Sequence, residues 1–236
     1  MLASSGGITD SIVRHPTARQ QYSVARFIRD SDSPEQPAAI GRRLAAVLRP
    51  GDYVGLDGPL GAGKTWLVRA IAESLGVEPA LVSSPTFVLM NEYPTRNGGA
   101  IVHCDAYRAG SLAELEDAGL EALSGEEIVL IEWADRIAAA WPESQRPELA
   151  RIRIEPTGAA SRRIELAIPE SWLPRDGAAV LLRNRTRCPR TGEVVEPENP
   201  HWPFASERAR LADLYDWFEE GHTIARPIEE RDLEEQ

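Results

Sequence analysis

The stretch "GDYVGLDGPLGAGKT", residues 51–65, decides the expected fold of this chain. Its first part, DYVGLD (52–57), is short and apolar, which is typical of a buried strand. Residues 58–65 fit the pattern G-x-x-x-x-G-K-[ST] and lead into WLVRAIAESLG (66–76), a helical segment that Gly76 is placed to end. A strand, a glycine-rich loop and a helix in this order predict a loop whose backbone amides encircle phosphate oxygens.

Lys64 is the only lysine in the sequence, because the other 25 of its 26 basic residues are arginines. A compact ammonium group enters a tight phosphate cradle as a point charge, whereas the wide, planar guanidinium group clashes there. We expect Lys64 to neutralise the terminal phosphates of a nucleotide and the Thr65 hydroxyl to ligate magnesium. A glycine-rich turn before a helix is the alternative interpretation, but it does not explain the lysine.

A loop of this kind needs a carboxylate at the end of a neighbouring strand to hold the magnesium shell. Asp105 follows the apolar run AIVHC (100–104), and Glu132 follows EIVLI (127–131). The carboxyl ends of the strands in an α/β sheet face one crevice, so both carboxylates are expected there. We assign Glu132 to magnesium and Asp105 to the attacking water; the residues alone also allow the reverse. A helix cap or a salt bridge is the alternative role for either one.

Three neighbours of these carboxylates are interpreted as structural. His103 is expected to be a buried structural histidine, and Cys104 a core residue of the strand. Trp133 is expected to pack beside the site.

Strands alternate with helices over residues 23–172, which indicates an α/β sheet that is partly parallel and finished by antiparallel strands. The predicted fold class is a P-loop NTPase-type sheet with flanking helices. Ser111 and Glu114 occupy capping-box positions of a short helix. The other expected elements are an edge strand (23–28), a helix with Ser33 as N-cap (33–48), strands 87–94 and 100–107, and a hairpin of 150–156 with 162–169.

Composition predicts a globular, cytoplasmic protein: 42% of residues are hydrophobic, 27% are charged, and the formal net charge is −11. No apolar run approaches the ~18 residues of a membrane span, and the N-terminus lacks the apolar middle of a signal peptide. A basic nucleic-acid footprint is absent except for RNRTRCPR (183–190), which we interpret as a solvated linker. The expected organisation is a disordered leader (1–22), the P-loop ATPase domain (23–172), a linker (173–187) and a C-terminal module with an acidic tail (188–236).

Four segments, in this order and spacing, resemble the TsaE family, the ATPase subunit of bacterial tRNA threonylcarbamoyladenosine synthesis: GDYVGLDGPLGAGKT, SSPTFVLMNEY, HCDAYR and IEWADR. The resemblance covers roughly residues 24–170, and its S-P-T-[FY] and H-x-D-x-Y-R segments are more specific than the P-loop. It implies an ATP-hydrolysing accessory subunit whose partners, TsaB and TsaD, transfer threonylcarbamoyl to adenosine near the tRNA anticodon. The chain then meets tRNA only indirectly, through these partners.

The resemblance also implies roles for single residues. Thr86 falls in a switch-like loop near the γ-phosphate, and Tyr107 and Arg108 support the site or contact a partner. Glu35 and Arg162 are the nearest candidates for contacts with the nucleotide base. The expected catalytic residues are Lys64, Asp105 and Glu132, the magnesium ligands are Thr65 and Glu132, and the ATP-binding residues are Gly58, Gly61, Ala62, Gly63, Lys64, Thr65, Trp66, Thr86 and Arg162.

The C-terminal stretch from Cys188 onward resembles a second family, YacG, a small zinc protein known as a DNA gyrase inhibitor. The family pattern has CP-x-C followed by NPF-x-PFCSERC, but Thr191, Ala205 and Ala209 occupy three of the four ligand positions here. A closed structural zinc site needs four ligands, usually Cys or His. We therefore expect a zinc-ribbon-like module without zinc, and the resemblance leaves contact with gyrase uncertain.

Apolar burial is expected to replace the metal in this module, by filling the old metal site or by docking on the ATPase domain. The side chains available for this are Trp202, Phe204, Leu211, Leu214, Tyr215, Trp217 and Phe218.

Two other functions use the same residues. A small-molecule or nucleoside kinase would need an acceptor pocket and usually a mobile Arg-bearing lid, and no insertion of lid length separates the P-loop from Glu132. A regulatory binding protein acting through the C-terminal module is the second alternative. Deletion of residues 183–236 separates it from the ATPase.

Overall fold

The computed structural model describes residues 24–31, 35–85, 88–141 and 147–219. The chain divides into two compact units, Met1–Leu182 and Arg183–Gln236. The predicted leader, the N-cap Ser33, the switch residue Thr86 and most of the acidic tail lie outside the described residues. None of the described helices is long and apolar enough to cross a membrane.

The first unit is built on a seven-stranded mixed sheet with the order β1-β7-β6-β2-β5-β4-β3. The four central strands β6, β2, β5 and β4 run parallel, while β1 pairs antiparallel with β7, β7 with β6, and β3 with β4. The α/β class and the antiparallel finish are therefore confirmed. The strands are β1 (Val24–Ser31), β2 (Tyr53–Asp57), β3 (Met90–Pro94), β4 (Ala100–Asp105), β5 (Glu127–Glu132), β6 (Leu149–Pro156) and β7 (Arg162–Pro169).

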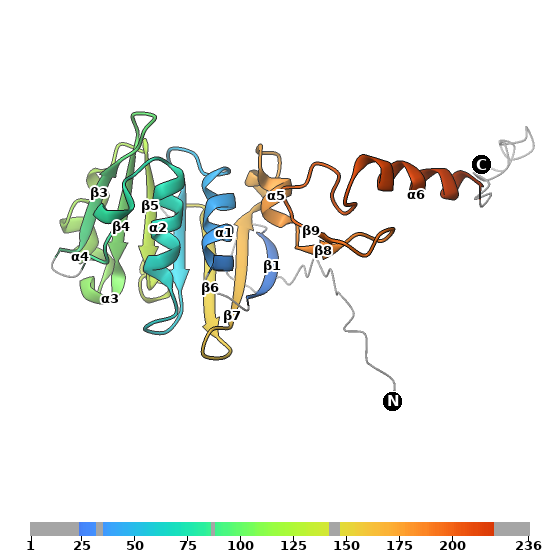
Figure 1. The fold of residues 1–236 in the computed structure, drawn as a ribbon. Coiled ribbons are helices and arrows are strands. Elements are labelled where there is room, and N and C mark those ends of the chain that lie inside the picture. Colours follow the sequence, from blue (N-terminus) through green and yellow to red (C-terminus); the bar gives the residue numbers. More distant parts are fainter. Residues whose placement is uncertain (1–23, 32–34, 86–87, 142–146, 220–236) are drawn as a thin grey trace, which may run out of the picture. The chain divides into compact units, whose positions relative to one another are not determined.

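Helices cover both faces of this sheet, because its central strands are apolar on both sides. In β5, Ile128 and Leu130 belong to one buried cluster, whereas Val129 and Ile131 belong to the other. The first cluster lies under α1 (Glu35–Ala45), α2 (Lys64–Ser74) and α5 (Ala178–Leu182), and the second under α3 (Ala106–Ala109) and α4 (Leu112–Asp117) (Figure 1). The described part of the unit also contains the short 3-10 segments η1 (Pro79–Leu81), η2 (Leu120–Ala122), η3 (Ala134–Arg136) and η5 (Glu170–Trp172).

Local interactions explain the positions of two helices. Ser111 Oγ accepts a hydrogen bond of 3.2 Å from the Glu114 backbone N–H, which is the N-cap predicted for α4. Gly41 lets α1 approach α2 closely, because a Cβ at this position would come within 3.0 Å of Ala70 Cβ.

The segment after β7 belongs to the first unit. Arg175 donates two hydrogen bonds to the carboxylate of Asp52, which directly precedes β2. Ala178 and Leu181 of α5 are buried in the first cluster. The linker predicted over 173–187 is thus too long at its start, because an ion pair and buried side chains hold residues 173–182 to this unit.

The second unit contains a two-stranded antiparallel sheet, β8 (Thr186–Arg187) with β9 (Val194–Val195), and the helix α6 (Glu207–Glu219). Its buried cluster is small and consists of Cys188, Val195 and Ala209, with Trp202, Phe204 and Ala205 packed against it. Trp202 and Phe204 therefore supply the expected apolar contacts of the module. Five larger apolar side chains of α6 are 45–66% exposed: Leu211, Leu214, Tyr215, Trp217 and Phe218.

Candidate active site

The loop between β2 and α2 takes a shape that only glycine allows at three positions. Gly58 has φ 144°, and a Cβ there would lie 2.3 Å from the carbonyl oxygen of Ile154 in β6. Gly61 and Gly63 have φ 75° and 108°, where side-chain-bearing residues are strained. The turn places the amino end of α2 beside the loop, where backbone N–H groups and the helix dipole favour an anion.

Lys64, the first residue of α2, holds its charge in a nearly closed environment and is only 5% exposed. Its Nζ donates to the carbonyl oxygens of Gly58, at 2.8 Å, and Pro59, at 3.0 Å. The same ammonium lies 3.7 Å from the centroid of the Trp133 ring, which is a cation–π contact. The loop carbonyls and the aromatic face thus stabilise the cation, and among the described residues it forms no ion pair with a carboxylate. Its N–H groups are therefore available to donate to a phosphate.

Three buried carboxylates surround this lysine at the ends of adjacent strands. Glu132 ends β5, Asp105 ends β4 directly opposite it in the parallel register, and Asp57 ends β2. Thr65 Oγ1 donates a hydrogen bond of 2.7 Å to Glu132 Oε1. Burial lowers the pKa of Lys64, and the negative charges of the neighbouring carboxylates, Glu132 foremost, oppose that shift. The structure therefore brings Lys64, Thr65 and Glu132 together at the carboxyl edge of the sheet, with Asp105 adjacent to Glu132.

Asp105 also has the alternative role considered for it, that of a helix cap. Its Oδ1 accepts a hydrogen bond of 3.0 Å from the Tyr107 backbone N–H and so caps α3. A cap and a role in the site are compatible, because a carboxylate has two oxygens.

Two residues near the loop have contacts that the sequence interpretation missed. His103 Nε2 lies 3.0 Å from Glu132 Oε1, although we had expected only a structural histidine. The spacing of two residues from Asp105 on one strand was an available signal, because it places both side chains on one face of the sheet. Asp57 Oδ1 accepts a hydrogen bond of 2.9 Å from the Asp135 backbone N–H. The position of Asp57 directly before Gly58 was the sequence signal that it lies near the loop.

Trp133 does more than pack beside the site. It has φ 58°, the one positive value at a non-glycine position in the described part of the chain, and its N–H donates to the carbonyl of Leu56 at 2.8 Å. Tyr107, which is half exposed, stacks 5.0 Å from the Trp133 ring, and the Arg136 guanidinium lies 4.7 Å above the Tyr107 ring. A stack of rings and cations thus runs from Lys64 to the surface.

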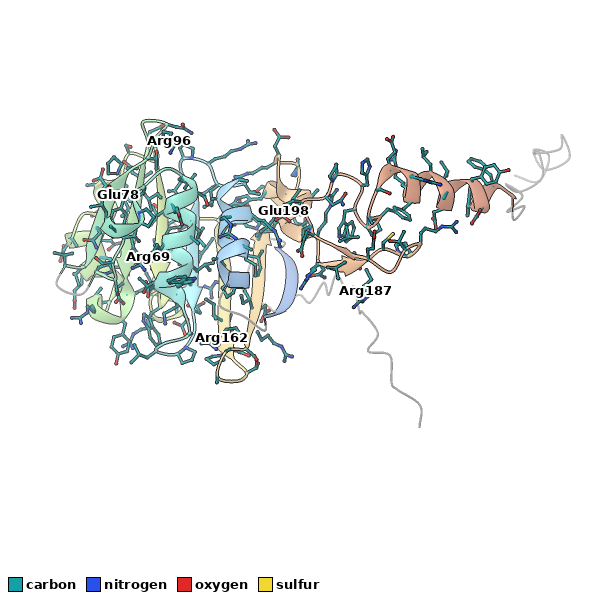
Figure 2. All side chains as sticks on the ribbon, viewed as in Figure 1. Arg69, Glu78, Arg96, Arg162, Arg187 and Glu198 are labelled. Carbon is teal, nitrogen blue, oxygen red and sulfur yellow. The ribbon has the colours of Figure 1, made fainter. Side chains whose placement is uncertain are left out.

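Arg162, labelled in Figure 2, reaches the loop from the start of β7: its Nε donates to the carbonyl of Ala62 at 3.3 Å. Trp66 is half exposed on α2, and Arg108 is exposed beside Tyr107. The side chain of Glu35 and all of Thr86 lie outside what the structure describes.

The donor set fits magnesium at the loop. The Thr65 hydroxyl is next to the Glu132 carboxylate, and Glu132 Oε2 makes no hydrogen bond to any described residue. Mg²⁺ usually takes one or two protein ligands and completes its shell with phosphates and water. Over the described ranges, no group of three or more His, Cys, Asp or Glu side chains is arranged to hold a metal ion.

The donor set of the second unit does not fit zinc. Cys188, Ala205 and Ala209 still converge in one cluster, but Cys188 provides the only sulfur among them. Burial alone would raise the pKa of Cys188. Hydrogen bonds from the Thr191 side chain and from backbone groups of Ala205, Thr191 and Arg190 oppose burial and lower the pKa to about 7. Among the described residues of this unit, a thiolate-stabilising environment is therefore present at one of the four positions, and the other three carry no side chain that ligates zinc.

The α/β sheet, the glycine-rich loop and the buried lysine at the start of a helix define a protein of the P-loop class. Residues 31–164 match the model of the family described as Threonylcarbamoyl adenosine biosynthesis protein TsaE, and the chain belongs to this family. Residues 186–235 match the model of DNA gyrase inhibitor YacG, so the second unit is YacG-like.

Curated relatives carry the name tRNA threonylcarbamoyladenosine biosynthesis protein TsaE. The chain is 48% identical to the one from Streptomyces coelicolor over 98 residues, which are 41% of this chain and 66% of that protein, just under two thirds of its length. It is 39% identical to the one from Bacillus subtilis over 135 residues, 56% of this chain and 79% of that protein. Among solved structures, Bacillus subtilis YdiB matches with a TM-score of 0.47 and 30% identity, covering 64% of this chain and 90% of that one.

Proposed function

We propose that this chain is an ATP-hydrolysing accessory subunit of tRNA threonylcarbamoyladenosine biosynthesis. Membership of the TsaE family supports the biological process. The observation that carries the chemistry is the 2.7 Å hydrogen bond between Thr65 and Glu132, beside a buried Lys64 that hydrogen-bonds to the carbonyl oxygens of Gly58 and Pro59.

Each of these side chains has a distinct task in the proposed reaction. Lys64 exchanges the carbonyls of Gly58 and Pro59 for the terminal phosphate oxygens of ATP. Thr65 and Glu132 hold Mg²⁺, which neutralises charge on the phosphates when it is bound. Asp105 orients the attacking water, because it lies opposite Glu132 at the end of the adjacent strand.

Transfer of the threonylcarbamoyl group belongs, in this proposal, to TsaB- and TsaD-type partners. The net charge of −11 disfavours direct binding to the tRNA backbone, so the partners hold the tRNA. Tyr107 and Arg136 are exposed next to the site and are available for contact with such partners.

Hydrolysis by a Glu132→Gln variant tests this proposal. The substitution retains an oxygen but removes the negative charge, so we expect nucleotide affinity to change little and magnesium-dependent hydrolysis to fall about 100-fold. Rates are measured for the full chain, with and without the TsaB–TsaD pair. Glu155→Gln, an exposed carboxylate on β6, is the matched control and should behave as the wild type. Wild-type hydrolysis by Glu132→Gln would refute the assignment.

A further inference from the structure

His103 lies on β4, is 0% exposed, and directs Nε2 toward Glu132 Oε1 at 3.0 Å. Its other ring nitrogen, Nδ1, has no hydrogen-bond partner among the described residues. A neutral ring with its hydrogen on Nε2 satisfies both observations, because Nε2–H then donates to Glu132 and Nδ1 carries only a lone pair. The other tautomer would put a buried N–H on Nδ1 that has no acceptor among the described residues, which is unfavourable.

Glu132 Oε1 therefore accepts two hydrogen bonds that come from different elements. Thr65 approaches from α2 at 2.7 Å and His103 from β4 at 3.0 Å. Two donors on the same oxygen fix the rotation of the carboxylate about its terminal bond. Oε2, which makes no hydrogen bond to any residue that the structure describes, then keeps a constant direction.

We propose that His103 is a positioning residue that sets the orientation of the Glu132 carboxylate toward the metal ion, through the hydrogen bond from Nε2. The inference rests on the proposed function, because it presumes that Glu132 serves a bound metal. It assigns to His103 a role in the reaction that does not require it to touch the substrate. Loss of the bond leaves the carboxylate held by Thr65 alone, and Thr65 must also turn toward the metal.

A purely structural histidine would contribute by packing, for example against Tyr93, whose ring centroid lies 6.4 Å away. Packing and positioning predict different results for two substitutions. His103→Phe retains a flat buried ring but removes the donor. His103→Gln loses the ring but places an amide N–H near the position of Nε2, within reach of Glu132.

The test measures the affinity of Mn²⁺ for the ADP-bound full-length chain by electron paramagnetic resonance, together with ADP affinity in EDTA. We expect His103→Phe to weaken Mn²⁺ binding about 10-fold and to leave ADP affinity in EDTA unchanged, as is typical when a residue that orients a metal ligand is lost. His103→Gln should restore most of the affinity. In a Glu132→Ala background, His103→Phe should have no further effect on Mn²⁺ binding, because its target is gone.

Equal Mn²⁺ affinity of the wild type and His103→Phe overturns the inference. It is also overturned if His103→Phe weakens Mn²⁺ binding as much in the Glu132→Ala background as in the wild type. If His103→Phe does not fold, Gln is compared with Asn, whose shorter amide does not reach Glu132; equal affinities of these two variants also overturn it. Absence of ADP-dependent Mn²⁺ binding in the wild type overturns the proposed function as well. Wild-type binding with an unchanged variant overturns only the role of His103.

Discussion

The loop end of the first unit and the buried cluster of the second unit both bring together residues that are separated in sequence. The first presents several polar side chains, whereas the second presents one thiol among apolar residues. At the loop, Lys64 and Glu132 are buried and each has hydrogen-bond partners. In the second unit, Cys188 and Ala209 belong to one small buried cluster, and Ala205 packs against that cluster. Convergence of the backbone therefore persists without the chemistry, and side-chain atoms decide which site can bind a ligand.

The thiol pKa values of the two cysteines, one in each unit, also differ between the two regions. Burial in the sheet raises the pKa of Cys104 to about 12. Burial acts on Cys188 in the same direction, but hydrogen bonds from Thr191 and nearby backbone groups outweigh it and lower the pKa to about 7. The second unit thus retains the backbone donors that stabilise a thiolate, although three ligand positions no longer carry sulfur.

Restoring those ligands is the change with the largest expected effect. We expect the wild-type module to bind no zinc, and the triple substitution Thr191→Cys, Ala205→Cys and Ala209→Cys should make it bind one zinc ion per chain. Structural zinc contributes on the order of 10 kcal/mol of apparent binding free energy in small modules. Elemental analysis of the purified wild type and variant measures the difference.

The matched control carries Ser at the same three positions, which preserves size but supplies no thiolate. It should contain no zinc. Stoichiometric zinc in the wild type would show that the module binds zinc despite the three replaced ligands. A triple cysteine variant without zinc would show that the backbone no longer places these positions for zinc binding.

Removal of the buried cation at the loop has the next largest expected effect. Lys64→Ala deletes charge-assisted hydrogen bonds to phosphate worth about 1.5–3 kcal/mol each, so nucleotide affinity should fall about 100-fold or more. Lys64→Arg should also lose affinity, because two carbonyls and the Trp133 ring enclose the ammonium within 3.7 Å. Titration with a fluorescent ADP analogue measures both variants, and Arg42→Ala removes an exposed charge of α1 as the control. Nanomolar or unchanged affinity in Lys64→Ala would contradict the assignment.

Sequence patterns predicted the sheet and the loop because both depend on local regularities. Apolar runs gave the central strands, and the spacing of Gly58, Gly63 and Lys64 gave the loop between β2 and α2. The linker start was missed, since the pair of Arg175 with Asp52 joins residues 123 positions apart and leaves no local pattern. His103 was interpreted as a buried structural histidine. Its spacing from Asp105 indicated the face of the sheet, but its contact with Glu132 depends on the pairing of β4 with β5.

Substitution of Asp57 has the smallest expected effect, which is a change in stability caused by the burial of a charge at the loop end. Burial raises the pKa of Asp57, and the hydrogen bond from the Asp135 backbone N–H only partly opposes that shift. The folded state therefore binds this proton more tightly than the unfolded chain. The stabilisation from protonated Asp57 is fully present below the ordinary pKa of 3.8 and is lost as pH rises through the raised folded value. At pH 7 the ionised carboxylate thus destabilises the fold.

Asp57→Asn removes this charge and keeps an oxygen that can accept from Asp135, so it should raise the melting temperature at pH 7. The gain is about 2–4 °C for a chain of this size if the relieved cost is near 1 kcal/mol. The difference from the wild type should shrink as pH falls toward 3.8, because wild-type Asp57 then becomes neutral as well. Thermal unfolding of both proteins between pH 4 and pH 8 measures it, with the exposed Asp176→Asn as the control. A gap that widens on acidification would mean that the charge of Asp57 stabilises the loop end, so that a buried charge there would carry no penalty in stability compared with the apolar cluster around Cys188.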